Sequence, residues 1–206
     1  HGVWPLFTLN LYINQTGDLS ILDEEVSYWK DAQIERAKRI DLNWNKKEGN
    51  CQKTKDGECY SGTIMEHLIL ENVICSLNIG EHGNIKLEDG DWNDQLDMAS
   101  DKGETIPFTA FYGSNLCNIA ELLEMQMKKE GRKAVSLFEE MEMLLLGLKE
   151  EGTESGQEIL EKYYKQIRSG ISGRKKEMPI QQLIDMLRWK GQSLLQQIRK
   201  NEWIEL

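Results

Sequence analysis

The stretch from Thr63 to Leu77 constrains the fold of this chain most, because it is apolar on nearly all sides of a helix. Its apolar residues recur at every phase of the helical turn: Ile64, Met65, Leu68, Ile69, Leu70, Val73, Ile74 and Leu77. A helix of this kind is buried all round rather than lying on a surface. The sequence therefore predicts one buried helix within a larger helical array.

Further helices are predicted along the whole chain, since only three prolines interrupt it. Thr105 followed by Pro107 is a helix start signal. Residues 41–60 are polar and predict an irregular excursion or a small hairpin. No convincing strand alternation is present, so we predict an all-α array of about seven helices with one long loop. The predicted helices cover, approximately, residues 5–14, 22–39, 63–77, 105–129, 133–149, 158–168 and 179–200.

Length and charge limit the class of protein. A chain of 206 residues can bury a core as one domain. No apolar run reaches the length of a membrane span, and no signal peptide opens the sequence. A net charge of −10 argues against a nucleic-acid or anionic-membrane partner. Because the chain starts at His1 rather than Met, we expect a piece of a longer protein. Without a signal peptide, we expect a cytoplasmic location.

The four cysteines show no metal-binding spacing. Cys75 and Cys117 lie in apolar helical contexts and are predicted to be small core residues. Cys51 and Cys59 flank a polar turn and could meet across a hairpin, although reduced thiols are the default without a secretion signal. A zinc site is not expected.

The segment Glu88–Asp94 packs four carboxylates, an indole and a carboxamide into seven residues. It reads as a loop between two strongly helical stretches. A carboxylic acid can protonate a leaving group, and an aromatic plane can stack on the apolar face of a pyranose ring. Crowding by Asp97, Asp101 and Glu104 would raise carboxyl pKa values, which suits a general acid. The segment therefore predicts a sugar-binding catalytic loop.

Other interpretations of the polar segments are weaker. A calcium loop starting at Asp89 would need glycine at its sixth position and glutamate at its twelfth, but the chain has Asp94 and Ser100 there. A solvated acidic turn would not require Trp92. His67, on the buried helix, is predicted to be a core histidine, whereas His82 precedes the loop and could line the site.

The sequence Gly90-Asp91-Trp92-Asn93-Asp94 resembles the DWND signature of the inverting glycoside phosphorylases, the cellobiose phosphorylase family (glycoside hydrolase family 94). Further matching segments come in the family's order and extend the resemblance over about residues 1–120. They are Trp4-Pro5, Thr16-Gly17-Asp18, Ile21 to Glu25, Thr63 to His67, His82-Gly83 and Lys102-Gly103-Glu104. The remaining helices are similar to an elaboration found in larger members, including those that act on β-1,2-linked glucans.

The resemblance implies that residues 1–206 are one segment of an (α/α)6 barrel. Residues 1–130 would supply barrel helices with a catalytic loop at 80–104, and 131–206 would supply additional helices. It implies reversible phosphorolysis of a β-glucoside to α-glucose 1-phosphate, with inorganic phosphate as co-substrate and no further cofactor or metal. A homodimer is compatible with the resemblance.

The resemblance also implies individual roles within the motif. Asp94 would be the general acid and Trp92 would contact the sugar. Asp91 and Asn93 would hold the loop, with Glu104 and His82 as further substrate-binding candidates. Gln95 replaces the family's usual glycine. The family's sugar-gripping arginine–aspartate pair and its phosphate-binding histidine are not found in this sequence, so we expect the segment alone to be inactive.

Two alternatives stay open at this stage. An inverting hydrolase on the same barrel would need a second carboxylate roughly 6.5–9.5 Å from Asp94, for which Glu104 is the candidate. A non-catalytic helical carbohydrate-binding module would not depend on Asp94 at all.

Overall fold

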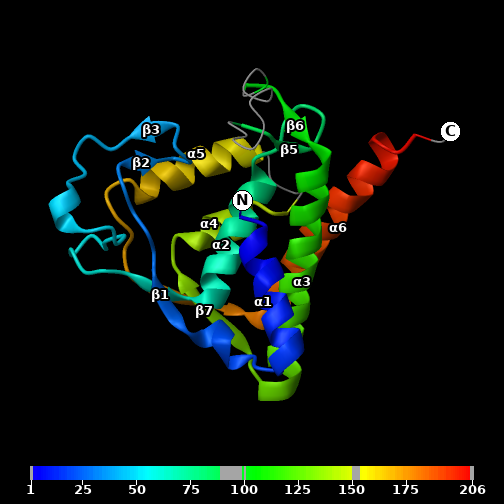
Figure 1. The fold of residues 1–206 in the computed structure, drawn as a ribbon, viewed down its shortest axis with the longest axis horizontal. Coiled ribbons are helices and arrows are strands. Elements are labelled where there is room, and N and C mark those ends of the chain that lie inside the picture. The colour runs from blue at the N-terminus through cyan, green and yellow to red at the C-terminus, as the bar shows by residue number, and fades with distance from the viewer. Residues whose placement is uncertain (1, 89–98, 100, 150–153, 205–206) are drawn as a thin grey trace.

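The computed structural model describes residues 2–88, 99, 101–149 and 154–204. Helices dominate this part of the chain and are joined by short strands and turns (Figure 1). The α-helices are α1 (Trp4–Thr16), α2 (Ile64–Leu77), α3 (Ile106–Glu130), α4 (Met141–Leu146), α5 (Gly156–Ile167) and α6 (Ile180–Asn201). Two short 3-10 helices cover Ser20–Asp23 and Lys46–Glu48. None of the described helices is long and apolar enough to cross a membrane.

Short strands pair into four separate two-stranded antiparallel sheets. The strands are β1 (Glu25–Ser27), β2 (Gln33–Ile34), β3 (Arg39–Ile40), β4 (Ser61–Thr63), β5 (Ile85–Lys86), β6 (Glu104–Thr105), β7 (Ala134–Phe138) and β8 (Lys175–Pro179). The pairs are β1–β4, β2–β3, β5–β6 and β7–β8. The mostly helical prediction is therefore confirmed, whereas a strictly all-α fold is wrong.

Side-chain caps start the helices where the sequence predicted. The hydroxyl of Thr63 accepts a hydrogen bond from the backbone N–H of Glu66 at 3.1 Å and so caps α2. Thr105 caps α3, with Pro107 in its first turn. Ser155 and Glu158 form a capping box at the start of α5. Each cap satisfies a backbone donor that the helix itself leaves free.

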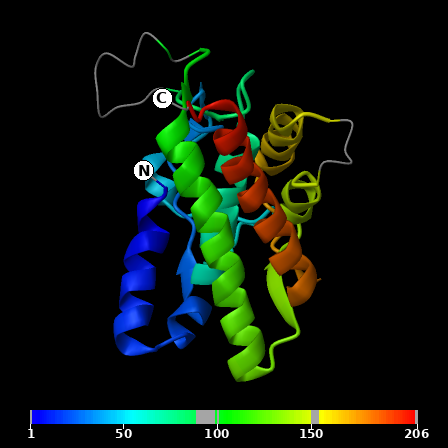
Figure 2. The same cartoon turned by 90° about the vertical axis from the view of Figure 1, so that its right-hand side faces the viewer.

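The α2 helix lies at the centre of the hydrophobic core, as its all-round apolar pattern predicts. Met65, Leu68, Ile69, Val73 and Leu77 are each at most 3% exposed. Figure 2 shows α1, α3 and α6 side by side across one face, with α2 behind them. The described helices do not show a barrel.

Two glycines allow α3 and α6 to cross closely. A Cβ atom on Gly191 would lie 2.5 Å from the carbonyl oxygen of Gly113 and 2.8 Å from the sulfur of Cys117. These distances are shorter than real contacts allow, so the crossing requires the absence of a side chain at Gly191. The backbones of α3 and α6 therefore approach each other closely at this point.

The predicted helix over residues 22–39 is wrong. Residues 25–27 instead form β1, which pairs with β4 through Val26 opposite Gly62. The following residues form the β2–β3 hairpin, where Glu35, Arg36 and Ala37 all have positive φ angles. Three consecutive residues in the left-handed region cannot continue an α-helix. The helical spacing of Val26 and Trp29 in the sequence was therefore coincidental.

The predicted helix over residues 133–149 is also wrong in its first half. Residues 134–138 form β7, which pairs along its whole length with β8, from Ala134 opposite Pro179 to Phe138 opposite Lys175. The helix then begins only at Met141 as α4. Pairing with a strand about forty residues further along the chain overrides the local helical pattern.

Cys51 and Cys59 form a disulfide bond with a Cα–Cα distance of 5.8 Å. The chain between them turns back on itself, because the backbone N–H of Thr54 donates to the carbonyl of Glu58 at 2.8 Å. The prediction that these residues could meet across a hairpin is confirmed, and reduced thiols as the default are wrong for this pair. Cys75 is a buried free thiol, and Cys117 is a half-buried one.

Glu66 is a buried carboxylate that joins distant parts of the chain. Its side chain is fully buried and accepts hydrogen bonds from the hydroxyls of Tyr28 and Tyr60 at 3.1 Å. It also accepts one from the backbone N–H of Phe138 at 2.9 Å. Burial raises the pKa of Glu66 above its ordinary value, although these three donors oppose that shift. One side chain of α2 therefore joins β7 to the residues just after β1 and just before β4.

Replacing Glu66 with alanine should destabilise the fold by about 3 kcal/mol, because two tyrosine hydroxyls and one backbone N–H would lose their buried acceptor. Glu66→Gln should cost less, since the amide keeps one acceptor oxygen and removes a costly buried charge. Urea unfolding monitored by circular dichroism measures both, with the exposed Glu121→Ala as a control. Equal midpoints for Glu66→Ala and the control would contradict this role.

Candidate functional site

The β5–β6 pair forms the stem of the predicted catalytic loop. Ile85 lies opposite Thr105 and Lys86 opposite Glu104, and the N–H of Leu87 donates to the carbonyl of Gly103 at 2.8 Å. The two ends of the segment between residues 87 and 103 therefore lie side by side. Asp91, Trp92, Asn93 and Asp94, with Gln95, lie outside the described residues.

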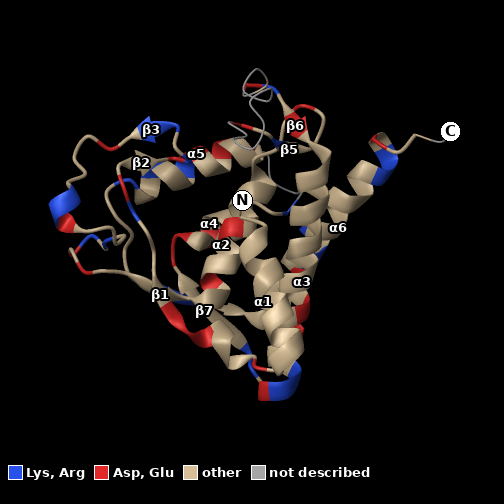
Figure 3. Cartoon of the chain, viewed as in Figure 1, with Lys and Arg blue, Asp and Glu red and all other residues tan. Residues whose placement is uncertain are grey.

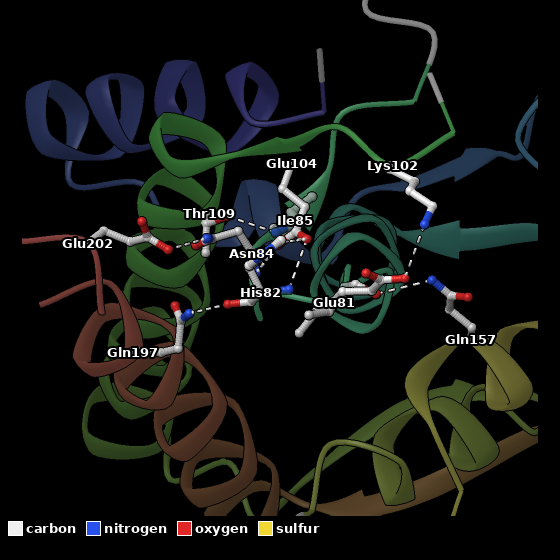
Figure 4. Close-up of polar contacts among 11 residues, drawn as sticks. Glu81, His82, Asn84, Ile85, Lys102, Glu104, Thr109, Gln157, Gln197 and Glu202 are labelled. Atoms are coloured by element: carbon white, nitrogen blue, oxygen red, sulfur yellow. Dashed lines mark hydrogen bonds and ion pairs between the residues drawn. The ribbon is translucent and has the colours of Figure 1, made fainter. Parts of the chain in front are cut away.

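Glu104 binds the turn that precedes β5. Its Oε1 atom accepts the backbone N–H of His82 at 2.9 Å, and its Oε2 atom accepts the backbone N–H of Asn84 at 2.8 Å (Figure 4). The imidazole Nδ1 of His82 also lies 3.1 Å from Oε1. A Cβ atom on Gly80 would lie 2.4 Å from the Glu104 carboxylate, so a glycine lets the turn close over it.

The same turn is held from three helices as well. From α6, Gln197 donates its Nε2 to the carbonyl of His82 at 2.6 Å. Glu202, just after α6, accepts from the Nδ2 of Asn84 at 2.8 Å. From α5, Gln157 donates to the carbonyl of Ile79 at 3.1 Å, and from α3 the hydroxyl of Thr109 accepts the N–H of Ile85 at 2.8 Å. Figure 4 shows these side chains converging on residues 79–85.

The electrostatics of Glu104 favour a structural role for this carboxylate. Burial would raise its pKa, but the hydrogen bonds from His82 and Asn84 outweigh burial and hold the pKa below its ordinary value. The side chain is 9% exposed, whereas that of His82 is 80% exposed. An ionised carboxylate whose two oxygens already accept backbone N–H groups is a weak candidate for activating water. The imidazole of His82 lies open to solvent next to the stem.

The other end of the loop begins at Glu88, which is tied to the β2–β3 hairpin. Its Oε2 atom accepts from Arg36 at 2.7 Å, and its Oε1 atom lies 3.0 Å from the ammonium of Lys38. Burial raises the pKa of Glu88, but the charges and hydrogen bonds of Arg36 and Lys38 together outweigh burial and lower the pKa overall. Glu88 has a positive φ of 52°, a strained angle for this residue type. Both ends of the acidic segment are thus fixed by ionised carboxylates.

The structure brings together two of the six predicted site residues, Glu104 and His82. Sequence analysis missed Arg36 and Lys38, because they lie in a region that it assigned to a helix. It also missed the backbone contacts of Glu104, which follow from the strand pairing. The polar turn sequence Gly80 to Asn84 was the available signal for a tight turn near the loop.

No metal centre is formed by the described residues: they contain no group of three or more histidine, cysteine or acidic side chains that could hold an ion.

His67, predicted to be a core histidine, is half-buried. Its Nε2 lies 3.0 Å from the carbonyl of Val26, and its ring stacks on Tyr28 with centroids 3.6 Å apart. Burial lowers the pKa of His67, which favours the neutral imidazole.

Comparison with characterised proteins points to a glycoside phosphorylase as the class of protein to which this chain is related. The chain is similar to the solabiose phosphorylase of Paenibacillus borealis, with 28% identity over 131 residues. The matched residues make up 63% of this chain and 13% of that protein, so the chain spans only a small part of its relative's length. No model of a known protein family matches the chain.

Substituting Glu104 with glutamine should make the fold less stable at neutral pH by about 2 kcal/mol, because hydrogen bonds to a charged acceptor are lost. Since the pKa of folded Glu104 is lowered, its contribution is fully present above the ordinary value of 4.5 and is lost as the pH falls through the lowered value. Urea unfolding at about pH 7 and about pH 3 should show the difference between wild type and variant shrinking in acid.

Glu81→Gln is the matched control, since that carboxylate lies on the same turn but is 78% exposed and pairs with Lys102 only at 3.7 Å. It should change stability by less than about 0.5 kcal/mol at either pH. A Glu104→Gln effect that stays constant across this pH range would show that the carboxylate charge is not involved.

Proposed function

We propose that this chain is part of the catalytic domain of an inverting glycoside phosphorylase that acts on β-glucosides. The observation that carries the proposal is the agreement between two independent features. The chain resembles a glycoside phosphorylase in sequence, and its DWND segment lies between two fixed ends, at Glu88 and at the β5–β6 stem. A catalytic loop needs such support, because its acid must be held within a fraction of an ångström of productive geometry.

In the proposed reaction, Asp94 protonates the glycosidic oxygen while inorganic phosphate attacks the anomeric carbon from the opposite face. The bond from the anomeric carbon to the leaving oxygen breaks, and a bond to a phosphate oxygen forms with inversion. Phosphate is already anionic, so no second carboxylate is needed to activate it, unlike water in an inverting hydrolase. Trp92 contacts the sugar, Asp91 and Asn93 hold the loop, and His82 and Glu104 stand at its base.

The wider assembly is part of the same proposal. Trp4, Phe7 and Leu11 lie along α1 at helical spacing and are about half exposed, with Trp4 at 53%. An apolar stripe of this kind is suited to packing against a further helix, which supports an (α/α)6 barrel completed by other residues or a homodimer contact. We extend the proposal to a β-1,2-oligoglucan phosphorylase-like member with an oligosaccharide substrate.

A cytoplasmic location also belongs to the proposal. The Cys51–Cys59 disulfide is a bond more typical of oxidising compartments. Mass analysis of the protein alkylated in its native compartment tests this location: alkylated Cys51 and Cys59 would support it, and an intact disulfide would reject it.

The proposed activity is tested with the natural protein that contains this chain. Offered α-glucose 1-phosphate and a panel of β-linked glucose disaccharides, it should release inorganic phosphate with one acceptor. Asp94→Asn should lower the rate by about two to four decades, the usual weight of general acid catalysis. Asp56→Asn, an exposed carboxylate outside the predicted catalytic loop, is the control and should retain most of the rate.

Two results would reject the proposal. Hydrolysis of a β-glucoside at a rate independent of phosphate would identify an inverting hydrolase instead. Full activity of Asp94→Asn, or no turnover of any glucoside by a folded protein, would favour a carbohydrate-binding module.

A further inference from the structure

A cavity of about 620 Å³ lies between α2, α5 and the segment at residues 28–36. None of the described residues that line it belongs to the β5–β6 stem. Its volume is in the range of sites that bind small molecules or short oligomers. On α2, His67, Glu71 and Cys75 line it at intervals of one helical turn.

Aromatic rings make up much of the cavity lining. Tyr28, Tyr112 and Tyr163 line it, and the ring of Tyr28 is fixed by stacking on His67. Trp29 lines it as well and is 73% exposed, one of the most exposed large apolar side chains among the described residues. The backbone of Trp29 is paired with Cys51, so the disulfide hairpin supports this exposed indole. An exposed, supported aromatic ring at a cavity is suited to stacking on the apolar face of a sugar ring.

Polar groups for hydroxyl recognition lie in the same cavity. Glu71 is a half-buried carboxylate whose pKa is raised by burial. Because the Nε2 of His67 lies 3.0 Å from the carbonyl of Val26, this nitrogen carries the hydrogen and Nδ1 is the acceptor. Arg36 contributes a guanidinium, with Nη1 placed 3.3 Å from the sulfur of Cys75. These donors and acceptors match the hydroxyl edge of a sugar.

The charges around the cavity balance. Three cations line it, Lys30, Arg36 and Arg168, together with three carboxylates, Asp31, Glu35 and Glu71. Arg36 pairs with Glu88 at 2.7 Å, Lys30 pairs with Asp41 at 3.2 Å, and Arg168 pairs with Glu35. Figure 3 shows basic and acidic residues alternating along the chain on the β2–β3 side of the molecule. Because positive and negative charges are equal in number and the cations are already paired, the cavity favours a neutral ligand over a phosphate-bearing one.

We propose that this cavity binds a neutral glucose-containing saccharide, with Trp29 stacking on one sugar ring and Glu71 accepting hydrogen bonds from its hydroxyls. The choice of glucose rests on the proposed function, whereas the choice of a neutral saccharide rests on the cavity itself. Arg36 joins the cavity wall to Glu88, where the acidic segment begins. A saccharide in the cavity would therefore contact the same arginine that holds Glu88.

Isothermal titration of the 206-residue chain with β-1,2-, β-1,3- and β-1,4-linked glucose disaccharides, without phosphate, tests this proposal. At least one disaccharide should bind. Trp29→Ala and Glu71→Gln should each weaken its binding about tenfold, which corresponds to about 1.4 kcal/mol. Trp203→Ala removes an indole that is 75% exposed and does not line the cavity, and it should leave the affinity unchanged.

The outcomes separate this inference from the proposed function. Binding that Trp29→Ala weakens and Trp203→Ala does not would support the cavity even if the natural protein showed no phosphorolysis. Phosphorolysis with an unchanged KM in Trp29→Ala and Glu71→Gln would reject the cavity while keeping the enzyme. Preferential binding of glucose 1-phosphate, or no binding of any neutral disaccharide by a chain with native circular dichroism, would also overturn the inference.

Discussion

The candidate site depends on the carboxylate of Glu104, which binds the two backbone N–H groups of His82 and Asn84 in the turn before β5. This interaction ties the first strand of the stem to the second across the acidic segment that they enclose. Three helices contact the same turn, so the position of the stem is defined relative to the whole core. A loop with a flexible base could not present a general acid reproducibly, which is why the stem matters for the proposed reaction.

Buried or half-buried glutamates have different roles in this chain according to their partners. Glu104 and Glu88 are held ionised, by backbone donors and by Arg36 respectively, and both fix the ends of the acidic segment. Burial raises the pKa of Glu66, and its neighbours are tyrosine hydroxyls and one backbone N–H. Burial also raises the pKa of Glu71, which lines the cavity. Glu104, Glu88 and Glu66 are therefore assigned structural roles because protein groups bind their carboxylates, whereas Glu71 is assigned to ligand binding because it lines the cavity.

Local sequence signals predicted the helices whose ends carry caps. The side chains of Thr63, Thr105 and Ser155 each accept a hydrogen bond from a backbone N–H group in the first turn of the helix that follows. The capping residue and its partner lie within four residues of each other, so a local sequence pattern can reveal the cap. The errors at residues 25–40 and 134–138 share another cause: these strands depend on partners far along the chain, such as β8 for β7. The contacts of Glu66 with Phe138 and of Arg36 with Glu88 are equally non-local, so no periodicity could reveal them. In the site, the family resemblance named His82 and Glu104 as candidates, but nothing in the sequence indicated that Glu104 binds backbone N–H groups.

Amide hydrogen exchange at His82 and Asn84 tests the central structural claim most directly, namely that Glu104 fixes the base of the predicted catalytic loop. At neutral pH both amides should exchange slowly, at rates close to those of the Ile69 amide in the buried α2 helix. In Glu104→Gln, hydrogen exchange at both amides should become much faster, while the Ile69 amide stays protected. Exchange at His82 and Asn84 as fast as in exposed turns, or protection that Glu104→Gln leaves unchanged, would contradict the account.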